Sequence, residues 1–141
     1  MSSILTPSEL LCSVAEPTRL RILNCLAAAP LFVSDLQLIL DLPQPTVSRH
    51  LTVLKRVRVV RDTPIAQFVL YRLRVEGGST GRLIQAVLDA LGHDERFRME
   101  RHRALERSRV HGRSGTAGGG AERLLAKGAG AGRPEGEEGG P

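Results

Sequence analysis

The clearest pattern of apolar and polar positions in the chain runs from Pro43 to Arg58. Val47, Leu51 and Leu54 recur at intervals of four and three residues, so they share one side of a helix. The stretch contains no acidic residue, and its basic and hydroxyl side chains fall on the other sides. The pattern predicts a helix with an apolar back and a cationic front, which suits either an ordinary surface helix or the major groove of DNA.

Three shorter helices are predicted before this stretch. Thr6 and Glu9 have the spacing of a capping box, Pro17 is placed to start the second helix, and Ser34 is placed to cap the third. The second helix is expected to bury a stripe of Leu20, Leu23 and Ala27, which Ile22 and Leu26 widen. Residues 41–43 (DLP) predict a tight turn that leads into the basic helix, because Asp tolerates a left-handed backbone and Pro ends a helix.

After the basic helix the pattern changes to that of two short strands. Residues 57–61 are rich in β-branched side chains, and residues 67–74 alternate as a strand requires. Residues 63–66 are expected to form the tip of the hairpin between them. Two helices joined by a short turn and followed by a hairpin predict a winged helix-turn-helix, mainly α with a small β-hairpin.

The remaining sequence predicts one more amphipathic helix and a polar end. Residues 79–91 carry a wide apolar face that we expect a second copy of the chain to cover. Residues 93–110 are highly charged with nearly balanced signs, so we expect a solvated extension of that helix. The expected organisation is a DNA-binding and dimerisation domain at residues 1–110 and a disordered Gly/Ala-rich tail at residues 111–141.

The positive charge is concentrated around the basic helix. The 141-residue chain has a formal net charge of +5, whereas residues 42–75 alone hold seven basic residues and one acid, a net of +6. Aromatic residues make up only 3% of the chain and Trp is absent, which favours double-stranded DNA over a stacking platform for single strands. With neither a signal-peptide pattern nor an apolar run of membrane-spanning length, we expect a cytoplasmic protein.

Two segments carry a resemblance to a known family: residues 15–23 (AEPTRLRIL) and residues 42–51 (LPQPTVSRHL). Together they closely resemble the ArsR/SmtB family of bacterial winged-helix repressors, over about residues 7–91. The resemblance implies a homodimer assembled through the first and last helices. It also implies binding to an inverted repeat in operator DNA and an inducer that lowers DNA affinity. No cofactor is expected.

The resemblance places the base-reading residues at the start of the recognition helix, where side-chain chemistry agrees, since Gln pairs with adenine and Arg with guanine. The expected base readers are Gln44, Thr46, Ser48 and Arg49. The other expected DNA contacts are Thr52, Lys55, Arg56, Arg61 and Arg72. His50 is interpreted as a packed residue at the boundary between helix and core.

The sequence departs from the family at the usual metal sites. Many arsenic and heavy-metal sensors carry CVCDL at the start of the third helix, where this chain has FVSDL at residues 32–36, without either thiolate. In the last-helix zinc pattern, Asp89 and His102 fall at ligand positions but Leu91 and Leu105 replace their companions. An exposed pair of His102 and Glu106 remains as a minor alternative, and no metal site is expected.

Further departures concern the cysteines and two glycine positions. Cys12 and Cys25 are expected to be buried, inert thiols, with a thiol switch as the minor alternative. Arg58 stands where a glycine is common at the end of the recognition helix, so a less regular start of the first strand is expected. The hairpin tip also lacks glycine, which predicts a short or loosely ordered wing.

The leading hypothesis is therefore a homodimeric, sequence-specific repressor that an unidentified signal releases from its operator. The alternative is an adaptor that keeps the winged-helix scaffold for protein interactions without reading DNA. The sequence shows no catalytic constellation of nucleophile and base, no phosphate-binding glycine loop and no paired carboxylates, so an enzyme is not expected.

Overall fold

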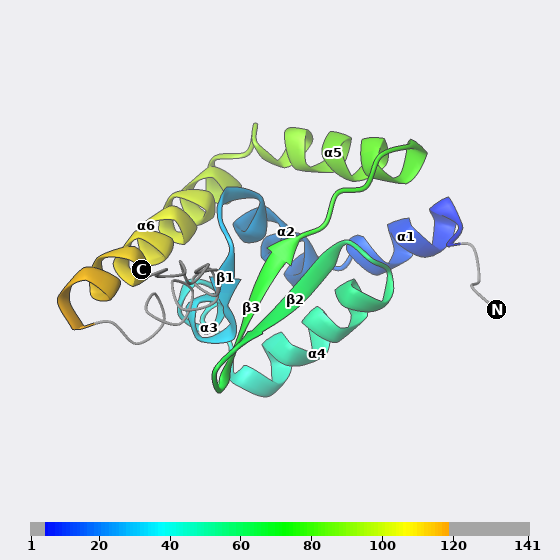
Figure 1. The fold of residues 1–141 in the computed structure, drawn as a ribbon. Coiled ribbons are helices and arrows are strands. Elements are labelled where there is room, and N and C mark those ends of the chain that lie inside the picture. The colour runs from blue at the N-terminus through cyan, green and yellow to red at the C-terminus, as the bar shows by residue number, and fades with distance from the viewer. Residues whose placement is uncertain (1–4, 119–141) are drawn as a thin grey trace, which may run out of the picture.

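The computed structural model describes residues 5–118 of the chain. Its elements, in chain order, are α1 (Pro7–Val14), α2 (Pro17–Ala28), β1 (Leu31–Phe32), α3 (Val33–Leu40), α4 (Gln44–Arg56), β2 (Val60–Ile65), β3 (Phe68–Leu73), α5 (Ser79–Leu91) and α6 (Glu95–Gly118) (Figure 1). Helices α3 and α4, joined by a short turn and followed by the β2–β3 hairpin, form the predicted winged helix-turn-helix. The predicted fold class, mainly α with a small antiparallel sheet, is confirmed.

The sheet has the strand order β1-β3-β2, and both of its pairings are antiparallel. The hairpin closes with Ile65 opposite Phe68, which leaves only residues 66 and 67 in the turn. The expected tip at residues 63–66 was wrong in position because Pro64 lies within β2. Since β2 is an edge strand, a residue without an N–H is tolerated there. The two-residue strand β1 was too short to be predicted from alternation.

The helix starts confirm one predicted cap and correct another. Thr6 and Glu9 form the capping box of α1: the Glu9 N–H donates to Thr6 Oγ1 (3.2 Å) and the Thr6 N–H to Glu9 Oε2 (2.8 Å). Ser34 does not cap α3, which already begins at Val33. Instead the backbone N–H of Phe32 donates to Oδ2 of Asp35 at 2.9 Å, so Asp35 closes the helix start from inside the first turn.

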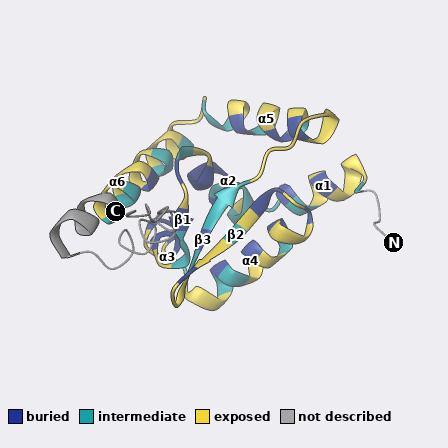
Figure 2. Ribbon diagram, viewed as in Figure 1, coloured by how far each residue is buried: buried dark blue, intermediate teal, exposed yellow. Residues whose placement is uncertain are grey.

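Helix α2 lies at the centre of the domain, in contact with all five other helices and with β3. Its residues 22–26 are buried without interruption, and they are Ile22, Leu23, Asn24, Cys25 and Leu26. The burial of Ile22, Leu23, Cys25 and Leu26 was predicted, whereas the burial of the polar Asn24 was not. Ala27, assigned to the predicted stripe, is instead exposed. Figure 2 shows the buried positions gathered on the inner sides of the helices around α2.

Helix α6 is not the solvated extension that its charge predicted. The chain turns at residues 92–94, and α6 then runs along the flank of the domain opposite α1, packed against α2 and α3 (Figure 1). Ala104 in the middle of α6 is fully buried. The helix continues to Gly118, past the start of the expected tail at residue 111, and residues 119–141 of that tail lie outside the described residues.

Candidate nucleic-acid interface

The apolar back of α4 is packed as predicted. Val47, Leu51 and Leu54 each have a relative exposure of 0%. Their burial fixes the rotation of the helix, and the exposed side carries most of the predicted DNA contacts, namely Gln44, Arg49, Thr52, Lys55 and Arg56. The polar front of the recognition helix is therefore accessible along its whole length (Figure 2).

Two side chains predicted to read bases lie half-buried on the flank of α4: Thr46 and Ser48. Ser48 Oγ accepts a hydrogen bond from Gln44 Nε2 at 2.8 Å, and the Ser48 carbonyl accepts one from Thr52 Oγ1 at 2.9 Å. These bonds bring Gln44, Ser48 and Thr52 together on one strip of the helix. A side-chain amide and two hydroxyls placed in this way offer donors and acceptors to base edges.

The turn between α3 and α4 sets the angle at which the recognition helix leaves the core. Asp41 adopts the left-handed conformation expected of it (φ 55°, ψ 53°), and the Leu42 N–H donates to the Gln37 carbonyl at 3.2 Å. The Leu42 side chain packs against the hydrophobic core. The turn is thus anchored both by its backbone and by an apolar side chain.

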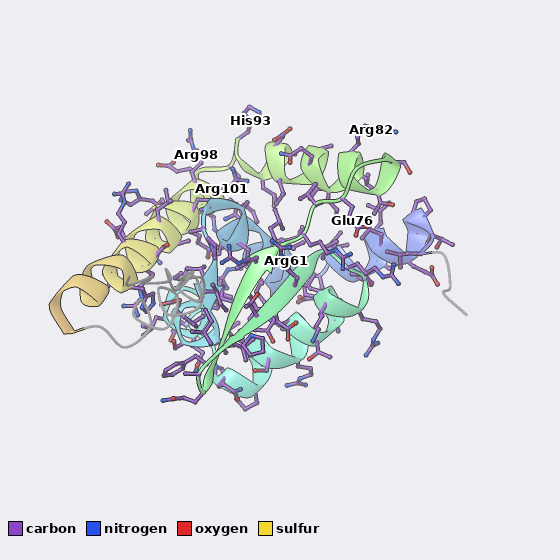
Figure 3. The ribbon with its side chains drawn as sticks, in the orientation of Figure 1. Arg61, Glu76, Arg82, His93, Arg98 and Arg101 are labelled. Carbon is purple, nitrogen blue, oxygen red and sulfur yellow. The ribbon has the colours of Figure 1, made fainter. Side chains whose placement is uncertain are left out.

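The hairpin brings two predicted phosphate contacts directly opposite each other. Arg61 on β2 pairs with Arg72 on β3, and neither guanidinium lies within 4.0 Å of a carboxylate in the part of the chain that the structure describes. Like charges facing each other across a strand pair repel. Figure 3 shows Arg61 on the hairpin. The pair forms a concentrated positive site, which an anion would stabilise.

Lys55 is less available than the other cations of α4. Its ammonium group lies 2.9 Å from Oδ2 of Asp62 on β2, and this hydrogen bond raises the pKa of Lys55. The ion pair joins the last turn of the recognition helix to the hairpin. A phosphate that binds Lys55 therefore competes with Asp62.

His50 lies at the boundary between helix and core, as interpreted from the sequence. Its side chain is 19% exposed, with Nδ1 located 3.6 Å from Glu16 Oε2 and 3.4 Å from Arg19 Nη1. Glu16 and Arg19 belong to the start of α2, where Glu16 also accepts the Arg19 N–H at 2.9 Å. His50 thus fixes the middle of α4 against α2, away from the exposed polar strip.

The structure brings no metal-ligand cluster together in residues 5–118: no group of three or more His, Cys, Asp or Glu side chains converges there. His102 and Glu106 do meet, at 3.1 Å, but both are largely exposed on α6. Asp89 instead accepts a hydrogen bond from Gln85 at 3.0 Å.

The two cysteines differ from each other in environment. Cys25 is buried as expected, and burial raises the pKa of its thiol to about 12. Cys12 is exposed on α1, so its expected burial was wrong: its neighbours Leu10 and Val14, rather than Cys12 itself, face the core. Both thiols are free in the structure.

Sequence reasoning overlooked one buried polar group beside the helix-turn-helix. Asp35, interpreted only as a favourable charge in the first turn of α3, is completely buried. Its carboxylate binds Arg107 and His111 of α6. The sequence signal for this buried group was an acidic residue among the apolar residues of a short helix. Its partners could not be predicted, because they lie more than 70 residues away.

The family model described as "Bacterial regulatory protein, arsR family" matches residues 16–62, from the start of α2 into the hairpin. The HTH-type transcriptional repressor SmtB of Mycobacterium tuberculosis is 39% identical over 85 residues, 60% of this chain and 59% of SmtB. The HTH-type transcriptional regulator Rv2034 of that bacterium is 38% identical over 55% of this chain and 72% of its own length.

Solved structures share the fold of part of this chain. Reduced HlyU from Vibrio cholerae superposes with a TM-score of 0.52 and 31% identity, covering 59% of this chain and 85% of HlyU. None of the described helices is long and apolar enough to cross a lipid bilayer.

Proposed function

The chain belongs to the ArsR family of bacterial regulatory proteins, and we propose that it is a transcriptional repressor that binds operator DNA in the cytoplasm. The observation that carries this proposal is the surface of α4. A helix without acidic residues exposes its polar side while its apolar side is buried, and it lies beside a hairpin with two unneutralised arginines. Such a helix fits the major groove, and such a hairpin fits the neighbouring phosphates.

Each predicted contact takes a role from its position. Residues in the first half of α4 read base edges: Gln44, Thr46, Ser48 and Arg49. Residues farther along α4 and on the hairpin bind phosphates: Thr52, Lys55, Arg56, Arg61 and Arg72. Phosphate contacts set the orientation and the salt dependence, whereas base contacts set the sequence preference.

The repressor acts as a homodimer through α1 and α5. Leu11 on α1 is 42% exposed, and Leu83, Val87 and Leu91 on α5 are only half-buried by their own chain. Apolar side chains left in this state on two helices are suited to pairing with a second copy. Two recognition helices related by a two-fold axis require an inverted repeat.

The proposal is tested by selecting binding sites from a random duplex library and measuring affinity over a range of salt concentrations. We expect an inverted repeat, with affinity falling steeply as salt rises. Arg49→Ala should cost about 1–3 kcal/mol on the selected site and relax the preference at one position in each half-site. Lys55→Ala should weaken all sequences equally and reduce the salt slope by about one for each phosphate that is no longer bound.

Arg98→Ala is the matched control, because Arg98 is an exposed arginine on α6, away from α4 (Figure 3). It should leave affinity and sequence preference unchanged. Equal binding to random and selected duplexes at moderate salt would refute the specific repressor. Repression in cells that survives a Gln44/Arg49 double alanine change would favour the adaptor instead.

A further inference from the structure

Helix α6 is fixed to the core by hydrogen bonds on its inner side. Asn24, buried on α2, donates from Nδ2 to the Phe97 carbonyl at 2.8 Å and accepts at Oδ1 from Arg101 Nε at 2.6 Å (Figure 3). Farther along the helix, Oδ1 of the buried Asp35 accepts from Arg107 Nε at 3.1 Å. Buried polar groups hold their partners in one arrangement. The rotation of α6 about its own axis is therefore fixed, and one set of residues always faces outward.

The outer face of α6, opposite these contacts, carries two acids, two bases and two apolar side chains, all of them exposed. They are Glu95, Glu106, Arg98, Arg109, Met99 and Leu105. His102 lies at their centre, with 70% of its side chain exposed. Several of these residues border one open groove of about 400 Å³. An exposed face with balanced charges and apolar side chains suits a protein partner better than a polyanion.

The charges of the outer face are arranged symmetrically about His102. Glu95 and Arg109 lie seven positions before and after it. Arg98 and Glu106 lie four positions before and after it. Because a helix turns by about 100° per residue, the two members of each pair are also rotated equally to opposite sides of His102. In each pair, one member is an acid and the other is a base.

This symmetry makes the outer face complementary to a second copy of itself. When another α6 lies antiparallel on it, with a two-fold axis through His102, the rotation exchanges the two members of each pair. Arg98 of one copy then faces Glu106 of the other, and Glu95 faces Arg109. A parallel pair in register would instead place each charge beside the same charge. The charge pattern therefore identifies both the partner, another copy of this chain, and its orientation.

Two apolar side chains complete the contact. Met99 and Leu105 lie three positions before and after His102 and are 54% and 38% exposed. The same rotation brings Met99 of each copy onto Leu105 of the other. From Glu95 to Arg109 the contact is about 21 Å long, so a single helix pair buries less than the roughly 1,200 Å² of a stable interface. We therefore expect a weak contact, which becomes effective between molecules that are already held side by side.

We propose that α6 joins two dimers through this antiparallel contact. Helix α6 lies on the flank opposite α1 (Figure 1), so a copy that pairs through α1 and α5 leaves the outer face of α6 uncovered. Each chain then has two isologous contacts, one within the dimer and one between dimers. Dimers on neighbouring operators bind cooperatively through α6. That role rests on the proposed homodimer and DNA binding, whereas the α6 contact can be measured without DNA.

The contact is tested by crosslinking the full-length protein with a short bis-maleimide at low salt. The background is Cys12→Ser, because Cys12 is an exposed thiol whereas Cys25 is buried. His102→Cys places two thiols at the two-fold axis, so we expect a covalent pair of chains. Arg96→Cys is the matched control. Arg96 is also exposed on α6, but it lies six positions from His102 and is rotated about 120° away from it, so we expect little crosslinking there.

Charge reversal tests the predicted pairing. In the His102→Cys background, Arg98→Glu or Glu106→Arg alone places like charges opposite each other at two symmetric sites and should slow crosslinking roughly tenfold. The two reversals together should restore crosslinking, because opposite charges then face each other again. Arg98 and Glu106 are eight residues and about 12 Å apart along their own helix, so this rescue cannot arise within one chain.

Cooperativity is measured on duplexes that carry two operators, with the distance between them varied over one turn of DNA. These variants keep the native Cys12 and His102. Either reversal alone should abolish cooperativity, and the two together should restore it. Affinity for a single operator should stay at the wild-type value in all of them, because α6 lies away from α4.

The outcomes are distinguishable. Equal crosslinking of the His102→Cys and Arg96→Cys variants, or absence of rescue by the double reversal, would refute the α6 contact. Rescue of crosslinking without cooperativity on paired operators would refute its role in repression. If the wild type did not bind a single operator specifically, the proposed function would fail, while the crosslinking result would still decide the α6 contact.

Discussion

Arg58 gives the sharpest test of the local physics at the end of the recognition helix. It has a φ of 61°, in the left-handed region that costs an ordinary residue about 1–2 kcal/mol. The Arg58 N–H donates to the Lys55 carbonyl at 3.1 Å, and the Val59 N–H donates to the Leu54 carbonyl at 3.2 Å. These two bonds form a Schellman motif, in which the position of Arg58 favours glycine.

We expect Arg58→Gly to stabilise the fold. Relief of the left-handed strain is partly offset by the greater freedom of glycine in the unfolded chain, about 0.5–1 kcal/mol. The net gain is about 0.5–1 kcal/mol, which raises the melting temperature by roughly 2–6 °C for a domain of this size. Thermal and urea unfolding measure this gain, with protein concentrations matched because the proposed dimer would melt in a concentration-dependent manner.

Arg58→Ala is the matched control. It removes the same charge but keeps a Cβ atom, so its stability should stay within about 0.5 kcal/mol of the wild type. If the glycine variant were no more stable than the alanine variant, the strain assigned to Arg58 would be refuted. The glycine effect would then have to come from the removal of charge.

Two further predictions concern α5 and the buried thiol. A Cβ atom on Gly81 would lie 1.6 Å from the Glu76 carbonyl oxygen, so Gly81→Ala should destabilise the fold by roughly 2 kcal/mol or more in urea unfolding. Gly77→Ala should leave the stability unchanged, because a Cβ atom there meets nothing within 4 Å. Equal destabilisation by the two substitutions would contradict the close approach of the Glu76 carbonyl to Gly81. Burial raises the pKa of Cys25 to about 12, so iodoacetamide at pH 8 should label the native chain once, at Cys12, and twice in denaturant, as read by intact mass. The unfolded thiol ionises before the native one, so Cys25 should also lower the free energy of unfolding as pH rises from about 9 to 12.

Local features of the fold were predictable because their causes lie within a few residues. The capping box of α1, the left-handed Asp41 and the buried stripe of α4 all follow from spacings of three or four positions. The positive φ of Arg58 explains why the expected irregularity did not occur. Arg58 itself adopts the conformation that glycine usually supplies, and β2 begins regularly at Val60.

The features that the sequence could not predict depend on contacts between residues that are distant in the sequence. Charge alone made residues 93–110 resemble a solvated helix, because the polar groups that bind this segment, Asn24 and Asp35, are distant in the sequence. Pro64 was interpreted as a turn residue, since nothing local distinguishes an edge strand from a loop. The pattern placed most of the expected DNA-binding residues of α4 on its exposed side, but the pairing of Lys55 with Asp62 required the hairpin register.

The edges of the small sheet have a consequence for crowding on DNA. Strand β1 has only two residues, and β2 carries Arg61 and the N–H-deficient Pro64 on the opposite edge. Short strands, charge and proline each prevent an edge from accepting a strand of another molecule. Copies brought together at neighbouring operators therefore cannot extend one sheet into the next. High local concentration should therefore not produce sheet-linked aggregates.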